Sequence, residues 1–162
     1  MTPLAKARLL ALIVPLALLG GAYGFQYVWA HLWPCEMCWW QRYAHFAALP
    51  FALAALLLGA RMKDGGRLLV WLAALAIFVS GVIGFWHAGV ELKLLPGFTQ
   101  CTSTLAGSAE DMLKAVFDRP MVRCDDVQWS WLGISMAGWN AIISLLSALV
   151  ILWLSFRKPG AA

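Results

Sequence analysis

Charged side chains are scarce in this sequence. Acidic and basic residues make up 12% of its 162 residues and hydrophobic residues 62%, whereas soluble domains carry about 25% charged residues. So few charges cannot cover every side of a protein with a hydrated surface, which excludes an ordinary soluble domain and favours a membrane protein. The net charge of +4 comes from scattered basic residues rather than from one patch, so nucleic acid is not an expected partner.

Four long runs lack any acidic or basic side chain, and each is long enough to cross a bilayer. A hydrocarbon core needs roughly 20 helical residues, and backbone groups in lipid must pair within their own segment, so these runs are expected to be helices. The predicted spans are about 9–30, 43–60, 68–90 and 131–156. We therefore predict one all-α integral membrane domain over residues 1–162, a four-helix transmembrane bundle surrounded by the lipid bilayer.

Basic residues gather at the two chain ends and between the second and third spans. These segments hold seven basic residues and one acid, whereas the loops 31–42 and 91–130 hold five basic and seven acidic residues. Cytoplasmic segments of membrane proteins carry an excess of lysine and arginine. Both termini are therefore expected in the cytoplasm, and both loops on the outer side.

No cysteine lies in a predicted span or in a cytoplasmic segment. Cys35 and Cys38 are in the first outer loop, and Cys101 and Cys124 are in the second. Disulfides persist in oxidising compartments outside the cytoplasm, and an even number of cysteines in two separated pairs suggests two disulfides. Three pairings are possible in principle, and neighbour with neighbour is the simplest.

The close cysteine pair in WPCEMCWWQR, residues 33–42, has three interpretations: a staple, a zinc site or a redox pair. A disulfide stabilises mainly by closing a loop, and Cys35 and Cys38 enclose only two residues. The wider loop from Cys101 to Cys124 is a better staple, worth about 3 kcal/mol. Zinc sites often use a second CxxC pair, which this sequence lacks. The pattern therefore favours a redox pair, and no metal site is predicted.

Residues around the close pair suit thiol chemistry. Only a thiolate attacks a disulfide, so the pKa of the attacking cysteine must be lowered. Cys38 lies where the second spanning helix is expected to begin, at its positive end. Arg42 follows four residues later on the same helical face, where it is expected to stabilise a thiolate or to reach lipid phosphates.

Other polar residues are expected near the same depth. His87, at the outer end of the third span, either lines the same pocket as Arg42 or is an interface residue. Gln26 and Gln41 are pocket donors or packing residues, and the claims of the other two histidines, His31 and His45, are weaker.

The second outer loop contains a predicted short helix. In SAEDMLKAVF, residues 108–117, Ser108 and Asp111 form a capping-box pattern, and the apolar residues that follow make one face. This helix is expected either to lie flat on the membrane or to pack on top of the bundle.

Two stretches of the chain resemble a known family. PCEMCWWQR, residues 34–42, has a proline, a CxxC pair and an arginine four residues after the second cysteine. CDDVQWSWLGISMAGWN, residues 124–140, leads from the last cysteine into the last span. With the four spans and two outer cysteine pairs, they resemble the bacterial disulfide bond formation protein B family over essentially the whole chain. Its members are quinone-dependent membrane oxidoreductases that reoxidise a periplasmic, DsbA-like disulfide donor.

The resemblance implies a role for each cysteine. Cys101 is the loop cysteine that the reduced donor attacks, and Cys124 is its disulfide partner. Cys35 and Cys38 form the membrane-proximal disulfide, and Cys38 is the thiolate that contacts the quinone.

The resemblance also implies a cofactor and a location. The cofactor is ubiquinone, with menaquinone as the alternative; Arg42 orients and polarises its ring, and His87 matches a histidine near it. The quinone carries two electrons to the respiratory chain. The protein is expected in the bacterial inner membrane with its cysteines facing the periplasm, and residues 108–117 match the family's membrane-parallel helix.

Two other classes of protein fit part of the pattern. A non-enzymatic membrane adaptor with four spans and two structural disulfides does not need an arginine beside the CxxC pair, so Arg42 favours the enzyme. A vitamin K epoxide reductase-like protein carries its CxxC pair late in the chain, whereas here the pair precedes the second span.

Overall fold

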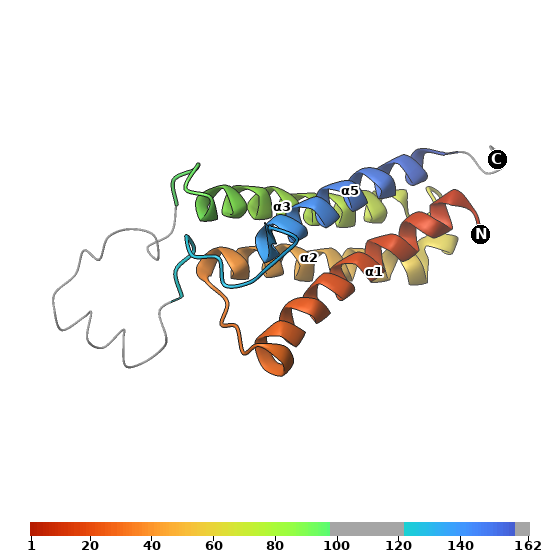
Figure 1. Ribbon diagram of the computed structural model, residues 1–162. Coiled ribbons are helices and arrows are strands. Elements are labelled where there is room, and N and C mark those ends of the chain that lie inside the picture. The colour runs from red at the N-terminus through yellow and green to blue at the C-terminus, as the bar shows by residue number, and fades with distance from the viewer. Residues whose placement is uncertain (98–121, 158–162) are drawn as a thin grey trace, which may run out of the picture.

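Four long helices form one bundle in the part of the chain that the computed structural model describes, residues 1–97 and 122–157 (Figure 1). All four are long and apolar enough to cross a membrane, which confirms the predicted all-α transmembrane bundle. The helical elements are α1 (Pro3–Gly24) with the π-helical turn η1 (Phe25–Trp29), α2 (Glu36–Leu58) with the 3-10 turn η2 (Gly59–Arg61), α3 (Arg67–Glu91) and α5 (Met136–Phe156).

The helices are arranged as four corners of a bundle. α3 packs extensively against both α2 and α5, and α1 packs against the same two helices, so α1 and α3 occupy opposite corners. The start of α1 and the end of α5 lie at one end of the bundle, while the start of α2 and the end of α3 lie at the other (Figure 1). The cysteine pair at the start of α2 is therefore at the end away from the first and last helical residues.

The second helix begins earlier than the hydrophobic run that predicted it. α2 starts at Glu36, with Cys35 as its N-cap, instead of at residue 43. Gln41 and Arg42 therefore lie within helical turns and not in a loop. The run without charges marks the part of a helix that lipid can surround, and a helix can extend beyond that part where protein covers its polar side chains.

A small hairpin precedes the last helix. Strand β1 (Ser130–Trp131) pairs antiparallel with β2 (Ile134–Ser135), so α5 begins at Met136 and not at 131, where the span was predicted. The two turn residues between the strands, Leu132 and Gly133, both have positive φ angles, as the tight hairpin turns that match strand twist require. Ser135 then caps α5 by accepting a hydrogen bond from Gly138 N–H at 3.1 Å.

Alanine dominates the core in the half of the bundle that is remote from the cysteines. Small side chains let helix backbones approach closely, which is how helices associate in lipid. Large apolar residues such as Leu57, Phe78 and Leu146 point outward instead. The fully buried cluster consists of Ala7, Ala11, Ala48, Ala52, Ala55, Val70, Ala73, Ala74, Ile77, Ala148 and Ile151.

Some sequence predictions fall outside the described residues. Cys101 and the short helix predicted over 108–117 both lie between residues 97 and 122, outside the described ranges, so the structure does not test them.

Gly84 sets how closely α3 approaches α5. A Cβ atom at this position would lie 2.9 Å from Asn140 Nδ2 and 3.0 Å from Ala137 O. We expect Gly84→Ala to push the helices apart and to cost about 1–3 kcal/mol, as overpacking usually does. Thermal unfolding in detergent measures the loss. The control is Gly20→Ala, where no atom lies within 4 Å, and a Gly84→Ala protein as stable as that control would contradict the packing argument.

Candidate active site

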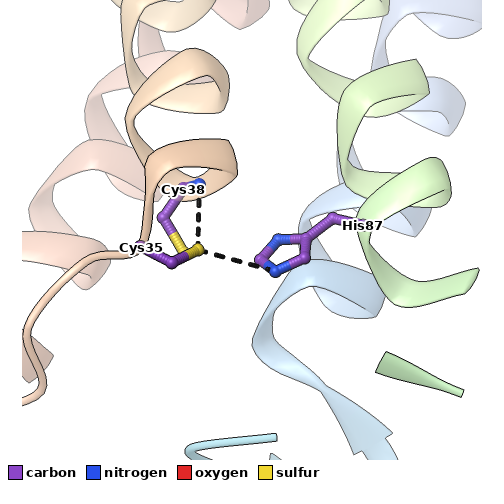
Figure 2. A group of neighbouring side chains, drawn as sticks. All are labelled: Cys35, Cys38 and His87. Atoms are coloured by element: carbon purple, nitrogen blue, oxygen red, sulfur yellow. Dashed lines mark hydrogen bonds between the residues drawn. The ribbon is translucent and has the colours of Figure 1, made fainter. Parts of the chain in front are cut away.

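The first turn of α2 brings two thiols together. Cys35, the N-cap, has its Sγ 3.3 Å from Cys38 N, whose N–H it accepts. The two sulfur atoms are 2.7 Å apart, and Figure 2 shows both at the start of α2, facing α3. Since a disulfide bond is about 2.05 Å long, the helix start holds these sulfurs where a small movement makes or breaks the bond.

A third cysteine packs onto the first. Cys124 is fully buried, in one cluster with Cys35, Met37 and Val90. Its thiol interacts with that of Cys35, and this contact, together with Cys38 and burial, raises the pKa of the Cys35 thiol. The structure thus brings a cysteine from the second loop to the close pair, with Cys35 between Cys124 and Cys38.

Ion pairs fasten the segment that carries Cys124 to the end of α3. Asp125 binds Arg123 through two hydrogen bonds of 2.8 and 2.9 Å. Lys93 reaches the same carboxylate and the Asp125 carbonyl oxygen, both at 2.6 Å. Arg123 and then Lys93 hold the pKa of the Asp125 carboxyl well below its usual range. We call Lys93, Arg123 and Asp125 the clamp.

His87 extends from α3 toward the thiols (Figure 2). Its Nε2 lies 3.1 Å from Cys124 O and 3.6 Å from Cys35 Sγ, and its Nδ1 lies 2.9 Å from Gln41 Nε2. Gln41 Nε2 also lies 3.2 Å from the carbonyl oxygen of Met37, which can only accept, so this atom is the amide nitrogen. His87 Nδ1 therefore accepts, and Nε2 carries the hydrogen that faces Cys124 and Cys35.

The amide of Asn140 on α5 connects the polar groups of three helices. Its Nδ2 donates to Gln41 Oε1 at 2.8 Å and to the Ser80 carbonyl oxygen at 3.3 Å. Its Oδ1 lies 3.0 Å from His45 Nε2 and accepts from Ser144 at 3.1 Å. One asparagine thus fixes both Gln41 and His45 in the buried interior.

Arg42 is a buried cation with neutral partners. It is 7% exposed, and it donates to Gln26 Oε1 at 2.6 Å and to Ala22 O at 3.4 Å. The rings of Tyr23 and Trp39 lie 4.8 and 5.1 Å from its guanidinium carbon. Among the described residues no carboxylate forms an ion pair with it. Gln26 reaches Arg42 from the π-helical turn η1, so the turn positions a residue of the site.

A cavity of about 420 Å³ joins these groups. Its wall is mainly apolar and comes from α1, the loop before α2, α2, the end of α3, the segment 123–131 and α5. Ligand sites are typically apolar cavities with a few convergent polar groups. The polar and sulfur-bearing side chains that α2 and its N-cap contribute are Cys35, Cys38, Gln41, Arg42 and His45.

Two thiols and one imidazole at the cavity also form a possible set of metal ligands. The Sγ atoms of Cys35 and Cys38 and a ring nitrogen of His87 lie within 4.8 Å of one another. Thiolate and imidazole are the ligands that zinc prefers. The reduced thiols therefore have the composition of a partial zinc site, although the spacing of the cysteines in the sequence favours redox chemistry.

The structure gathers most of the predicted site and adds residues to it. Cys35, Cys38, Cys124, Arg42 and His87 all lie at the same end of the bundle. The residues that sequence reasoning missed or ranked low, Gln26, Gln41, His45 and Asn140, hold Arg42 and the histidines in place. Their only sequence signal is that they are polar side chains within apolar segments, which are commonly functional.

The fold and site define a class, a multi-pass membrane protein with a buried thiol pair beside an apolar cavity. The family model described as disulfide bond formation protein DsbB matches residues 5–154. A disulfide bond formation protein B of Aromatoleum aromaticum is 31% identical over 152 residues, covering 89% of this chain and 90% of that protein. The namesake of Paracidovorax citrulli is also 31% identical, covering 98% of this chain and 91% of that protein. No solved structure matches. The chain belongs to the DsbB family and is a disulfide-forming oxidoreductase.

The clamp is expected to keep Cys124 buried. A carboxyl whose pKa is depressed in the folded state contributes stability above the ordinary carboxyl pKa of about 3.9 and loses it as the pH falls through the depressed value. The clamp therefore holds throughout the neutral range. We expect Asp125→Asn to speed alkylation of reduced Cys124 at neutral pH by roughly two- to fivefold, the scale of an exposed ion pair. Peptide-resolved mass spectrometry measures the rate.

The control for this prediction is Asp126→Asn. The Asp126 carboxylate is 67% exposed and makes a longer contact, 3.7 Å, with Arg123 Nε. Its loss is therefore expected to leave the labelling rate of Cys124 unchanged. Equal rates in both variants would show that the clamp does not bury Cys124.

Proposed function

We propose that this protein is a quinone-linked thiol oxidase. It takes two electrons from a reduced, DsbA-like periplasmic protein and relays them through Cys101–Cys124 and Cys35–Cys38 to ubiquinone, or menaquinone, in the membrane. Family membership supports the disulfide chemistry, and the placement of the thiols beside an apolar cavity supports the route. The quinone then delivers the electrons to the respiratory chain.

The single observation that carries the proposal is buried Arg42 without a counter-ion. A buried charge is costly unless it is paired, and this one has only neutral acceptors and aromatic faces as described partners. Its place in the cavity wall, one helical turn from Cys38, lets it stabilise negative charge that develops on an electron acceptor. A structural adaptor has no need for such a charge.

The apolar lining of the cavity and the nearby guanidinium support a quinone head group as the ligand. A bound quinone supplies a two-electron, two-proton acceptor. Cys38 provides the sulfur nearest Arg42 along α2, and the guanidinium has N–H groups that its two protein acceptors leave unused. The apolar wall from α1 and α5 excludes water and suits a lipid-soluble ring.

The proposed thiol steps use the order of the described cysteine sulfurs, in which Cys35 lies between Cys124 and Cys38. The donor dithiol reduces the Cys101–Cys124 disulfide and leaves oxidised. The Cys124 thiolate then attacks Cys35, so that a Cys124–Cys35 bond forms, the Cys35–Cys38 bond breaks and Cys38 leaves as the thiolate. Attack of Cys101 on Cys124 re-forms the Cys101–Cys124 disulfide and releases Cys35, so that the Cys35–Cys38 dithiol holds the two electrons for the quinone. The Nε2–H of His87 faces Cys35 and Cys124 O, where it can donate to the sulfur that exchanges partners.

The proposed location is the bacterial inner membrane, with the thiols on the periplasmic side. The basic residues Lys6, Arg8, Arg61 and Lys63 lie at the helix ends remote from the cysteine pair. The excess of lysine and arginine in cytoplasmic segments supports this orientation.

Replacing Cys38 is the direct test of the relay. The purified protein, mixed with reduced donor and a short-chain quinone, should consume quinone absorbance in step with donor oxidation. Cys38→Ser should abolish quinone consumption, because no thiolate remains beside Arg42, while the donor still forms a mixed disulfide with the protein. A fully active Cys38→Ser protein would contradict the proposed route.

Charge and positioning can be separated at Arg42. Arg42→Met should lower kcat for quinone reduction roughly 100-fold or more, the scale for loss of one preorganised electrostatic group. Gln26→Met removes only the 2.6 Å acceptor that anchors the guanidinium, so it should mainly raise KM. Steady-state kinetics with varied quinone distinguishes the two, and normal kcat in Arg42→Met would rule out the electrostatic role.

A further inference from the structure

The cavity contains a second histidine that the thiol chemistry does not use. His45 is 3% exposed and forms part of the cavity wall. Its Nδ1 is buried and has no hydrogen-bond partner among the described residues. A buried polar atom without a partner is destabilising, so its presence in a cavity wall calls for a ligand that supplies one.

The hydrogen bonds on the other side of the ring decide what that ligand must offer. Asn140 Nδ2 faces the carbonyl oxygen of Ser80, which only accepts, so the remaining amide atom, Oδ1, is an acceptor. His45 Nε2, 3.0 Å from that oxygen, must therefore carry the hydrogen. In the neutral ring Nδ1 is then a lone pair, which needs a donor.

His45 belongs to the same helical face as the residues proposed to contact the quinone. Cys38, Gln41, Arg42 and His45 are spaced i, i+3, i+4 and i+7 along α2, and all four line the cavity. His45 lies one turn beyond Arg42, away from the thiols. The two side chains thus project from neighbouring turns toward one ligand, with a cation nearer Cys38 and a hydrogen-bond acceptor deeper in the bundle.

We propose that His45 Nδ1 accepts a hydrogen bond from a hydroxyl group of the reduced quinone, so that the cavity binds the quinol more tightly than the quinone. This inference rests on the proposed function. Quinone oxygens can only accept and meet the lone pair unfavourably, whereas a quinol hydroxyl can donate to it. Because the site favours the reduced form, the bound quinone becomes the stronger oxidant of the Cys35–Cys38 dithiol.

Removing the acceptor should weaken this preference for the quinol. We expect His45→Leu to weaken quinol binding about tenfold relative to quinone binding, which equals about 30 mV in the potential of a bound two-electron couple. His45→Asn places an oxygen where Nδ1 was, so it should retain most of the preference. Ser155→Ala is the control; it removes a buried hydroxyl that accepts from Trp71 at 2.9 Å, at the other end of the bundle.

Binding is measured without electron transfer. All variants are prepared in a Cys38→Ser background, and a short-chain quinone is titrated against the fluorescence of the tryptophans that line the cavity, including Trp33 and Trp129. The corresponding quinol is then added as a competitor. The ratio of the two dissociation constants is the readout.

Each outcome decides between the two proposals. If the Cys38→Ser protein binds neither form, the quinone function fails and this inference fails with it. If it binds both and His45→Leu leaves the ratio unchanged, only the inference is overturned. Loss of both ligands in His45→Leu, together with an altered ratio in His45→Asn, would assign His45 a structural role and also overturn it.

Discussion

The carboxamide of Asn140 is the constraint on which the interior of this protein depends. Polar groups inside a membrane protein must find partners among themselves because lipid offers none. Asn140 is a partner for two such groups at once. Its nitrogen donates to Gln41 and so fixes the orientation of that amide, and its oxygen accepts from His45. Gln41 in turn donates to His87 Nδ1 and so fixes which ring nitrogen of His87 carries the hydrogen. The hydrogen positions of two histidines, one facing sulfur and one in the cavity wall, thus follow from the orientation of a single amide.

The bundle separates its stabilising part from its reactive part along the helix axes. Half of it is a seam of alanines that brings the backbones together, and the other half contains the cavity and the buried polar side chains. Gly84 lies where α3 meets Asn140, so close helix packing continues up to the first buried amide. A buried arginine and two buried histidines are tolerated there because the tightly packed half stabilises the fold.

The sequence predicts those parts of the site that follow from local periodicity. Cys38 and Arg42 are four residues apart, so any helix through them places both on one face, and the structure has that helix. Hydropathy places the start of the second helix too late because Gln41 and Arg42 are covered by protein rather than lipid. Asn140 and Gln41 are 99 positions apart, and no periodicity links residues on different helices. The π-helical turn that aims Gln26 at Arg42 likewise leaves no pattern in a single sequence.

Cys35 both caps α2 and interacts with the sulfurs of the two other described cysteines, Cys38 and Cys124. Its Sγ accepts the N–H of Cys38, an interaction of the kind that contributes about 1 kcal/mol to the start of a helix. In the structure Cys35 and Cys38 are free thiols, and Cys35 Sγ interacts with Cys124 while it still accepts that N–H. In the proposed relay, the N-cap therefore holds the first turn of α2 in place while its sulfur changes partners, so the residue that reacts also keeps the helix start ordered.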